Sequence, residues 1–155
     1  MVTSSYDVVG NRLTVAYPEN RGLSCTYDLR NLLTTVTDGT RTTAYGYDAA
    51  GNRTSMTMPN GVVASYTFDS NNRLTQIAHT NLGGMNLYSA QYTLDAAGMR
   101  TLVTETGVNR DTRVLTFGYD NLYQLTSEAD SSRNGGNPTS YTFGNRINNC
   151  LVIDL

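Results

Sequence analysis

Recurring carboxylates are the side chains in this sequence whose spacing could support chemistry. Six aspartates recur along the 155 residues at steps of 21, 20, 21, 26 and 25: Asp7, Asp28, Asp48, Asp69, Asp95 and Asp120. Aspartates spaced in this way would line up across the strands of a sheet, where two of them could lie the roughly 5–9 Å apart that glycoside hydrolysis requires. Such a column could also attract calcium, although the Asp-x-Asp-x-Gly spacing of a calcium loop is missing. The alternative is that each aspartate only holds its own turn.

Two glutamates, Glu105 and Glu128, fall outside this recurrence. An activity acquired by a repeat protein would use residues that the repeat itself does not need. A small carbohydrate-active hydrolase would therefore draw its catalytic pair from Glu105, Glu128, Asp95 and Asp120. The structural alternative is that both glutamates are solvated loop or strand positions.

Tyrosines that precede the aspartates could bind sugar. Aromatic faces stack on pyranose rings, while neighbouring Arg and Asn side chains bond to hydroxyl groups. The same tyrosines would also be needed to pack the sheet. The candidate carbohydrate-binding residues are Tyr47, Tyr66, Tyr92 and Tyr119.

Histidine and cysteine give little support for catalysis or metal binding. His79 is the only histidine, and no Gly-x-Ser-x-Gly motif accompanies it. Combined with Cys25 or Cys150 it has no recognised metal-ligand spacing. The two cysteines could form one bridge, or provide a reactive thiol, or be incidental small apolar residues. The sequence predicts no metal site and no cofactor.

Composition excludes several classes of function. The net charge of −2 and pI near 5.2 provide no basic surface for nucleic acid or anionic membrane. All eleven basic residues are arginines, so Schiff-base and P-loop lysine chemistry is absent. No apolar run approaches the ~20 residues that would span a bilayer. No apolar run follows Met1 either, so a secretion signal, if the protein is exported, is expected to lie outside this sequence.

One eight-residue stretch, Tyr47–Thr54 (YDAAGNRT), organises the chain because it is repeated with variations. A step of 20–26 residues is typical of a repeat architecture. A degraded copy covers 141–147. The clear copies are Tyr6–Leu13 (YDVVGNRL), Tyr27–Thr34 (YDLRNLLT), Phe68–Thr75 (FDSNNRLT), Leu94–Thr101 (LDAAGMRT) and Tyr119–Thr126 (YDNLYQLT).

Each copy predicts a strand, a turn and a returning strand. Alternation such as Tyr45-Gly46-Tyr47 places large side chains on one face, where we expect an aromatic ladder between neighbouring strands. The Asp carboxylate should accept backbone N–H groups of the turn. The arginine that follows should cover an aromatic ring or pair with an aspartate. The spacing of Leu74 and Ile77 predicts a bulge or a sharp bend at the start of the return strand. Residues expected to take positive φ are Gly10, Gly51, Gly98, Asn31 and either Asn71 or Asn72.

A second set of turns should close the repeats. Asp38-Gly39 and Asn60-Gly61 predict two-residue type I′ hairpins. The longer steps predict extended loops at 80–88 and 107–112, and residues 131–138 look like the loosest segment. We therefore expect an all-β chain of antiparallel hairpins, with a period of about 20–26 residues, in a curved or spiralling sheet over 1–147. Residues 148–155 are predicted to be a non-repeat tail.

The Tyr-Asp-x-x-Gly-Asn-Arg-Leu-Thr pattern, with a glycine turn about ten residues later, resembles the YD-repeat (Rhs-repeat) family. The resemblance covers residues 1–147, and the family includes bacterial Rhs polymorphic toxins, the C components of insecticidal toxin complexes and teneurins. It implies a β-hairpin strip that spirals into a hollow shell around a toxin or inner domain. It also implies carbohydrate binding at cell surfaces and a secreted or cell-surface location as part of a bacterial parent protein.

The chain departs from the family in two respects. It has too few repeats to close a comparable shell, and no Asp-Pro-containing core segment follows Arg146. We therefore expect a fragment with open sheet edges, able to pair with the rest of a shell or with another chain. The sequence leaves two functions to compare: a structural or binding module without catalysis, and the small hydrolase. A surface that binds carbohydrate without turnover is an intermediate hypothesis.

Overall fold

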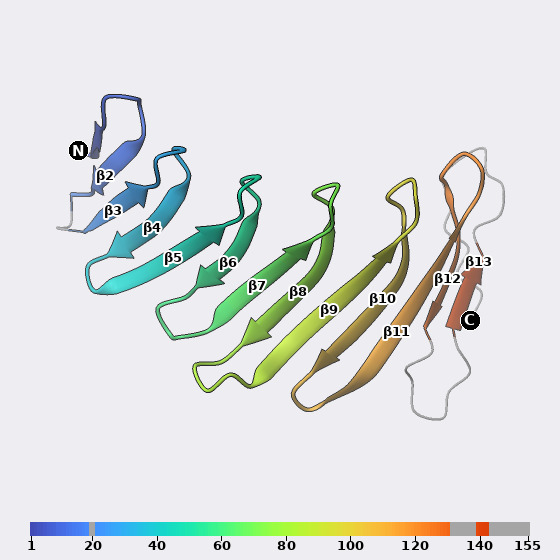
Figure 1. Cartoon of the computed structure of the whole chain (residues 1–155). Helices are drawn as coiled ribbons and strands as arrows, with labels where there is room; N and C mark the ends of the chain where they lie inside the picture. The colour runs from blue at the N-terminus through green and yellow to red at the C-terminus, as the bar shows by residue number, and fades with distance from the viewer. Residues whose placement is uncertain (19–20, 131–138, 143–155) are drawn as a thin grey trace.

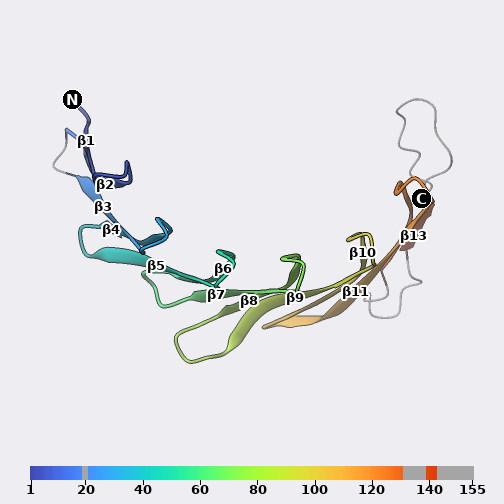
Figure 2. The same cartoon turned by 45° about the horizontal axis from the view of Figure 1, so that its top comes forward.

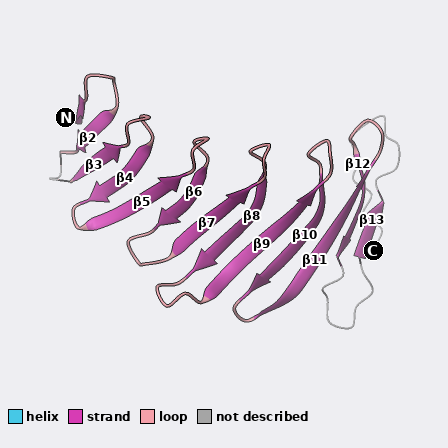
Figure 3. Ribbon diagram, viewed as in Figure 1, coloured by secondary structure: helices cyan, strands magenta, loops and turns pink. Residues whose placement is uncertain are grey.

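The computed structural model describes residues 1–18, 21–130 and 139–142, and within them it is a single antiparallel sheet of thirteen strands without helices. The strands follow one another in the sheet in sequence order (Figures 1 and 3). The all-β prediction is therefore confirmed. The strands are β1 (Thr3–Tyr6), β2 (Arg12–Ala16), β3 (Gly22–Tyr27), β4 (Leu33–Asp38), β5 (Arg41–Tyr47), β6 (Arg53–Thr57), β7 (Val63–Phe68), β8 (Leu74–Thr80), β9 (Asn86–Leu94), β10 (Arg100–Gly107), β11 (Arg110–Tyr119), β12 (Leu125–Asp130) and β13 (Thr139–Thr142).

The turns lie along the two long sides of this strip. Each of the six aspartates follows an odd-numbered strand, so all six turns lie on one side, which we call the Asp side (top of Figure 1). The connections that lead back from even-numbered to odd-numbered strands lie on the opposite side. The strip is curved along its strand order, as Figure 2 shows.

The two faces of the sheet differ in chemistry. Tyr45 pairs with Met56, which pairs with Ala64, so these side chains share one face with the other large residues. We call it the aromatic face. Gly46 pairs with Ser55 on the other side, the Ser/Thr face, where hydroxyl groups of opposed residues bond directly. Such bonded pairs are Ser5–Thr14 (2.6 Å), Thr26–Thr35 (2.6 Å), Thr37–Thr42 (3.0 Å) and Ser89–Thr106 (2.7 Å).

Packing is confined to one layer. Each strand contacts only the strands next to it in sequence, so no second layer covers either face in the described part of the chain. The main buried cluster is Ala90, Val103 and Leu115, which Tyr88, Tyr92 and Phe117 shield from the side. Across the described residues, the buried hydrophobic residues are these three with Val15 and Ala64. A globular domain of similar length buries a larger core, because its sheets pack against a second layer.

The bulge predicted after each Asp turn is confirmed. Phe68 pairs with Leu74 and Thr67 with Gln76, so Thr75 has no opposed residue. The same shift follows the other five Asp turns. Thr75 Oγ1 donates to the Thr67 carbonyl at 3.1 Å, which satisfies a polar group at the bulge.

The turns on the other side differ from those predicted. Only Gly39 has positive φ between β4 and β5, as in a type II′ turn, not the type I′ predicted at Asp38-Gly39. At Asn60-Gly61 only Gly61 has positive φ, and the turn spans Met58–Val62. The extended loop expected at 107–112 is also wrong, because β10 ends at Gly107 and β11 begins at Arg110. The extra residues lengthen the strands instead. The predicted loop at 80–88 shrinks to 81–85, and the predicted loose segment 131–138 lies outside the described residues.

Candidate functional site: the Asp turns and the aromatic face

Each Asp turn is a three-residue hairpin loop in which the aspartate binds the backbone. The Asp69 N–H donates to the carbonyl of Arg73 (2.9 Å), and the N–H of Asn72 donates back to the Asp69 carbonyl (3.0 Å). Asp69 Oδ1 accepts the N–H groups of Asn71 and Arg73, each at 2.9 Å. The other five turns share this backbone pattern. The carboxylate that the sequence offered for catalysis is thus the acceptor that organises its own turn.

The third residue after each aspartate takes positive φ, as predicted for the glycines, Asn31 and one of two asparagines. Asn72, at φ 59°, is the asparagine in this position. Tyr123 occupies the same position at φ 61°, which the sequence did not suggest because a bulky side chain rarely adopts this conformation.

These bonds lower the pKa of several turn carboxyls. At Asp48 the main cause is the hydrogen bond from the Asn52 side chain, and at Asp28 it is the backbone N–H of Leu32. At Asp69 the backbone N–H of Arg73 has the largest effect. Partial desolvation opposes the shift in each case but does not overcome it.

Stability should therefore fall in acid. Because the folded-state pKa values of Asp28, Asp48 and Asp69 lie below the ordinary 3.8, these carboxylates stabilise the fold fully above about pH 4. That stabilisation is lost as the pH falls through the folded-state values. The urea concentration at the unfolding midpoint, measured from pH 7 to pH 2, should decrease once the pH is below 4. This decrease should be smaller in Asp48→Asn. A decrease that is unchanged in this variant would contradict the assignment.

The turns are of two kinds that alternate along the chain. Glycine turns have Gly three residues and Arg five residues after the aspartate, and they are the turns of Asp7, Asp48 and Asp95. Leucine turns have Leu five residues after the aspartate and a residue other than glycine at the third, and they are the turns of Asp28, Asp69 and Asp120. The period of the pattern is thus two hairpins, not one.

Side-chain bonds join the first five of the six Asp turns in succession, and their chemistry follows this alternation. From a glycine turn to the next leucine turn, Asn11 Nδ2 donates to Asn31 Oδ1 (2.9 Å), and Asn52 Nδ2 donates to Asn72 Oδ1 (2.8 Å). From a leucine turn to the next glycine turn, an arginine donates to the carbonyl of the aspartate. Arg30 Nη1 reaches the Asp48 carbonyl (2.7 Å), and Arg73 Nη1 reaches the Asp95 carbonyl (3.0 Å).

Tyrosines before the aspartates also link hairpins. The Tyr27 hydroxyl donates to the carbonyl of Arg12 (3.0 Å) in the preceding hairpin. Tyr47 donates to the Leu33 carbonyl (2.9 Å) and Tyr119 to the Arg100 carbonyl (2.9 Å) in the same way. These three tyrosines therefore each bond to the hairpin before their own.

Phe68 occupies the position of these tyrosines without a hydroxyl. Phe68→Tyr should add the bond to the Arg53 carbonyl and raise the free energy of unfolding by about 0.5–1.5 kcal/mol, the usual worth of one hydrogen bond. Urea denaturation would measure the change. Tyr47→Phe, which removes the equivalent bond, should lower the free energy of unfolding by a similar amount. A gain in this control would contradict the stabilising role of the tyrosine hydroxyl.

Arginines of the glycine turns stack on the aromatic face. The Arg53 guanidinium lies 5.1 Å from the Tyr66 ring centre and 5.9 Å from that of Tyr45. Arg100 lies in the same way between Phe117 (5.0 Å) and Tyr92 (5.8 Å). Arg73 instead pairs with Asp69 at 2.7 Å. Both predicted roles of the arginine are thus observed.

The predicted aromatic ladder is wrong in its details. The ring contact found in the described residues is His79 with Tyr88. Rings of the repeated motif lie on every second strand, about 9–10 Å apart, which is too far for direct packing. Arginine fills the space between them where a glycine turn supplies one.

The four candidate catalytic residues are not grouped. Asp95 and Asp120 lie in separate turns on the Asp side, and each accepts the N–H four residues on, from Met99 (2.8 Å) and Gln124 (2.9 Å) respectively. Glu105 lies on β10 opposite Arg113 of β11, whereas Glu128 lies on β12 opposite Phe117.

A charged cluster that the sequence did not suggest surrounds Glu105. Arg113 lies between Glu105 (3.5 Å) and Asp130 (2.9 Å), and Tyr88 donates its hydroxyl to Glu105 (2.8 Å). Desolvation and then Glu105 raise the pKa of Tyr88, and the bond to Asp130 raises that of Arg113. The arginine pairs with both carboxylates, so Glu105 is held by an ion pair and by the hydrogen bond from Tyr88.

The candidate sugar-binding tyrosines already make internal contacts. Tyr47 and Tyr119 use their hydroxyl groups to tie hairpins, while Tyr66 and Tyr92 each have an arginine against the ring. A sugar would have to use the remaining ring surface. The assignment of these residues stays a prediction.

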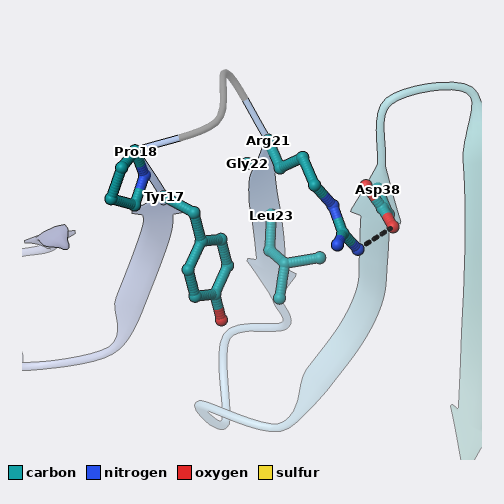
Figure 4. Close-up of a pocket in the computed structure, with 6 residues that line it drawn as sticks. All are labelled: Tyr17, Pro18, Arg21, Gly22, Leu23 and Asp38. Atoms are coloured by element: carbon teal, nitrogen blue, oxygen red, sulfur yellow. Dashed lines mark ion pairs between the residues drawn. The ribbon is translucent and has the colours of Figure 1, made fainter.

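The candidates His79 and Cys25 lie on different strands. His79 lies on β8, Cys25 on β3 has a free thiol, and Cys150 lies outside the described residues. The described chain holds no group of His, Cys, Asp and Glu suited to a metal, and it has no helix able to span a membrane. A hollow of about 490 Å³ lies on the side opposite the Asp turns, between Tyr17 with Pro18 and the exposed Arg21–Asp38 ion pair (3.9 Å; Figure 4).

Comparison with known proteins agrees with this geometry. The family model described as RHS Repeat matches residues 27–63, which contain one leucine turn and one glycine turn. No curated protein matches the chain.

Solved structures share the fold. The complex titled TcdB2-TccC3-Cdc42 has a TM-score of 0.73 and 22% identity, covering 83% of this chain and 7% of that one. TcdB2-TccC3 gives 0.72 and 23%, with the same coverage. TcdB2-TccC3 without its hypervariable C-terminal region gives 0.61 and 16%, covering 91% of this chain and 9% of that one. The chain therefore spans less than a tenth of the length of the chains it matches.

The RHS repeat matched over residues 27–63 and the fold shared with the TcdB2-TccC3 chains lead to one conclusion: this chain carries an Rhs repeat (YD repeat) and has the fold of those chains.

Proposed function

We propose that this chain is a segment of a shell wall whose aromatic face is directed at an enclosed polypeptide, and that it has no catalytic turnover. The observation that carries the proposal is the contrast between the two faces of a one-layer sheet. Large apolar side chains gather on one face, and no second layer covers them in the described chain. Apolar surface that is left uncovered, here interrupted by the stacked arginines and the Glu105–Arg113 ion pair, marks a site of interaction.

The hydrogen-bonded turns support a mechanical role. Turn-to-turn bonds and tyrosine ties join each hairpin to the next, so that the strip resists bending at the Asp side. The solved complexes of similar fold are named with a third component, Cdc42 in one case and TEV in another. A wall in an assembly of this kind has another polypeptide to contact. We also propose a secreted or cell-surface location within a larger protein.

Photo-crosslinking can test which face meets a polypeptide. Benzoylphenylalanine would replace Tyr66 on the aromatic face or, as the matched control, its neighbour Thr67 on the Ser/Thr face. Illumination with reduced and carboxymethylated α-lactalbumin, a permanently unfolded probe, should give adducts at position 66 and few at position 67. Equal adducts at both positions, or none at 66, would overturn the proposal.

The same samples can test for carbohydrate activity. Incubation with a panel of soluble polysaccharides should release no reducing ends from the chain. Release that is lost in Glu105→Gln or Glu128→Gln would establish the hydrolase instead. A polysaccharide that blocks the adducts at position 66 would assign the aromatic face to sugar.

A further inference from the structure

The outer edge of β1 repeats the features by which one hairpin recognises the next. Tyr6 stands where Tyr27, Tyr47 and Tyr119 stand in their own motifs, yet it is 60% exposed. Its hydroxyl makes no hydrogen bond to the described residues, whereas those three each donate to a carbonyl of the preceding hairpin.

The adjoining turn presents a second such feature. Asp7 opens a glycine turn, and in the other two glycine turns the carbonyl of the aspartate accepts an arginine from the leucine turn before it. Within the described chain the Asp7 carbonyl accepts only the Gly10 N–H, at 3.2 Å. Val8 beside it is fully exposed, so the approach is open.

We propose that the β1 edge is a docking surface for a leucine-turn hairpin of another Rhs repeat. The return strand of that hairpin pairs with β1 in antiparallel fashion. The carbonyl of its leucine accepts the Tyr6 hydroxyl, as Leu33 accepts Tyr47, and its turn arginine donates to the Asp7 carbonyl, as Arg30 does to Asp48. This inference rests on the proposed wall function and names the neighbour of this edge.

A second folded copy of the chain does not offer this partner. The return strands of its three leucine turns are β4, β8 and β12, and each already has a neighbour on both sides. The hairpin must therefore come from further repeats.

The alternation of glycine turns and leucine turns also predicts which kind of hairpin docks on β1. A glycine-turn hairpin at this edge would aim an asparagine, as Asn11 and Asn52 do, at the third residue after Asp7. That residue is Gly10, which has no side chain to accept the bond. Glycine turns and leucine turns thus recognise each other and not their own kind.

Two extended versions of the protein, equal in length, would distinguish a leucine-turn hairpin from a glycine-turn hairpin at this edge. Residues 22–41, which form the leucine-turn hairpin β3–β4 and the turn after it, would be repeated directly ahead of Met1. The control repeats residues 43–62, the glycine-turn hairpin β5–β6. In both, the register of the original hairpins aligns the added return strand with β1.

Both unfolding equilibrium constants are measured at the same urea concentration. The leucine-turn extension should lower this constant at least about tenfold more than the control does, because one charged hydrogen bond is worth roughly that factor. Arg30→Met within the added segment should remove the difference. Tyr6→Phe should leave the original chain unchanged and weaken the extended chain about two- to tenfold. Equal stabilisation by both hairpins, or an equal effect of Tyr6→Phe in both backgrounds, would overturn the proposal.

Hydrogen exchange at residues 3–6 provides a readout that does not require complete unfolding. Every second amide of this strand faces its free edge, because the others face β2. The edge-facing amides should exchange slowly in the leucine-turn extension and quickly in the original chain at all concentrations. Protection in the original chain that grows with concentration would show a second copy on β1 and would also overturn the proposal. Failure of the crosslinking at Tyr66 would leave these results unaffected, so the two proposals can fail separately.

Discussion

Aspartate in place of Val103 should lower the free energy of unfolding by about 3 kcal/mol or more, because a carboxylate would enter an apolar site without a partner. Val103 is only 3% exposed, although no second layer covers it in the described chain. It is covered from the sides, because Tyr92 of β9 and Phe117 of β11 pack against its cluster from the strands that flank β10.

The neighbouring Thr104 provides the control on the Ser/Thr face. Thr104→Asp should cost about 1 kcal/mol or less, the ordinary penalty of aspartate in a strand. Urea unfolding of both variants would measure the difference between faces. Equal losses would mean that the aromatic face is not the apolar side of the sheet in solution, and they would remove the main support for the proposed wall.

The turns were predictable because their chemistry is local. An aspartate followed three residues later by glycine or asparagine specifies the three-residue loop, since the carboxylate binds backbone that is four residues away at most. The bulge was also local, because a spacing of three from Leu74 to Ile77 cannot keep both side chains on one face of a flat strand.

Contacts between hairpins were harder to predict. The tie from Tyr47 to Leu33 spans 14 residues and depends on strand order, which period-two alternation does not contain. The alternation of glycine and leucine turns was legible in the sequence. It appears only when each aspartate motif is compared with the second motif after it, because adjacent copies differ at the fifth residue.

The length of β11 was predicted wrongly for a physical reason. Arg110, Asp111 and Thr112 look like loop residues, but in the structure they extend β11 beyond the apolar cluster. A strand in a one-layer sheet needs no apolar residue at its free end, since water solvates both of its faces there. Arg113 continues this polar end and binds Glu105 and Asp130, which explains why the acids of this region are paired.

The Asp69 turn should be among the most sensitive of the Asp turns to mutation, since its carboxylate accepts three hydrogen bonds, as many as those of Asp7 and Asp28. Besides two backbone N–H groups, Asp69 accepts Arg73 Nε at 2.7 Å, and Arg73 in turn reaches the next turn. Asp69→Ala should lower the free energy of unfolding, because all three of these hydrogen bonds are lost together.

Asp69→Asn separates the turn from the ion pair. Its amide oxygen can still accept the two backbone groups, so the expected loss is smaller than in Asp69→Ala, and Ser70→Ala in the same turn should be nearly neutral. Hydrogen exchange around Asp95 should rise in Asp69→Ala, because Arg73 loses the carboxylate that orients it toward the Asp95 carbonyl. If Asp69→Ala were as stable as Ser70→Ala, the aspartate would not be holding its turn, and its place in every repeat would need a functional explanation instead.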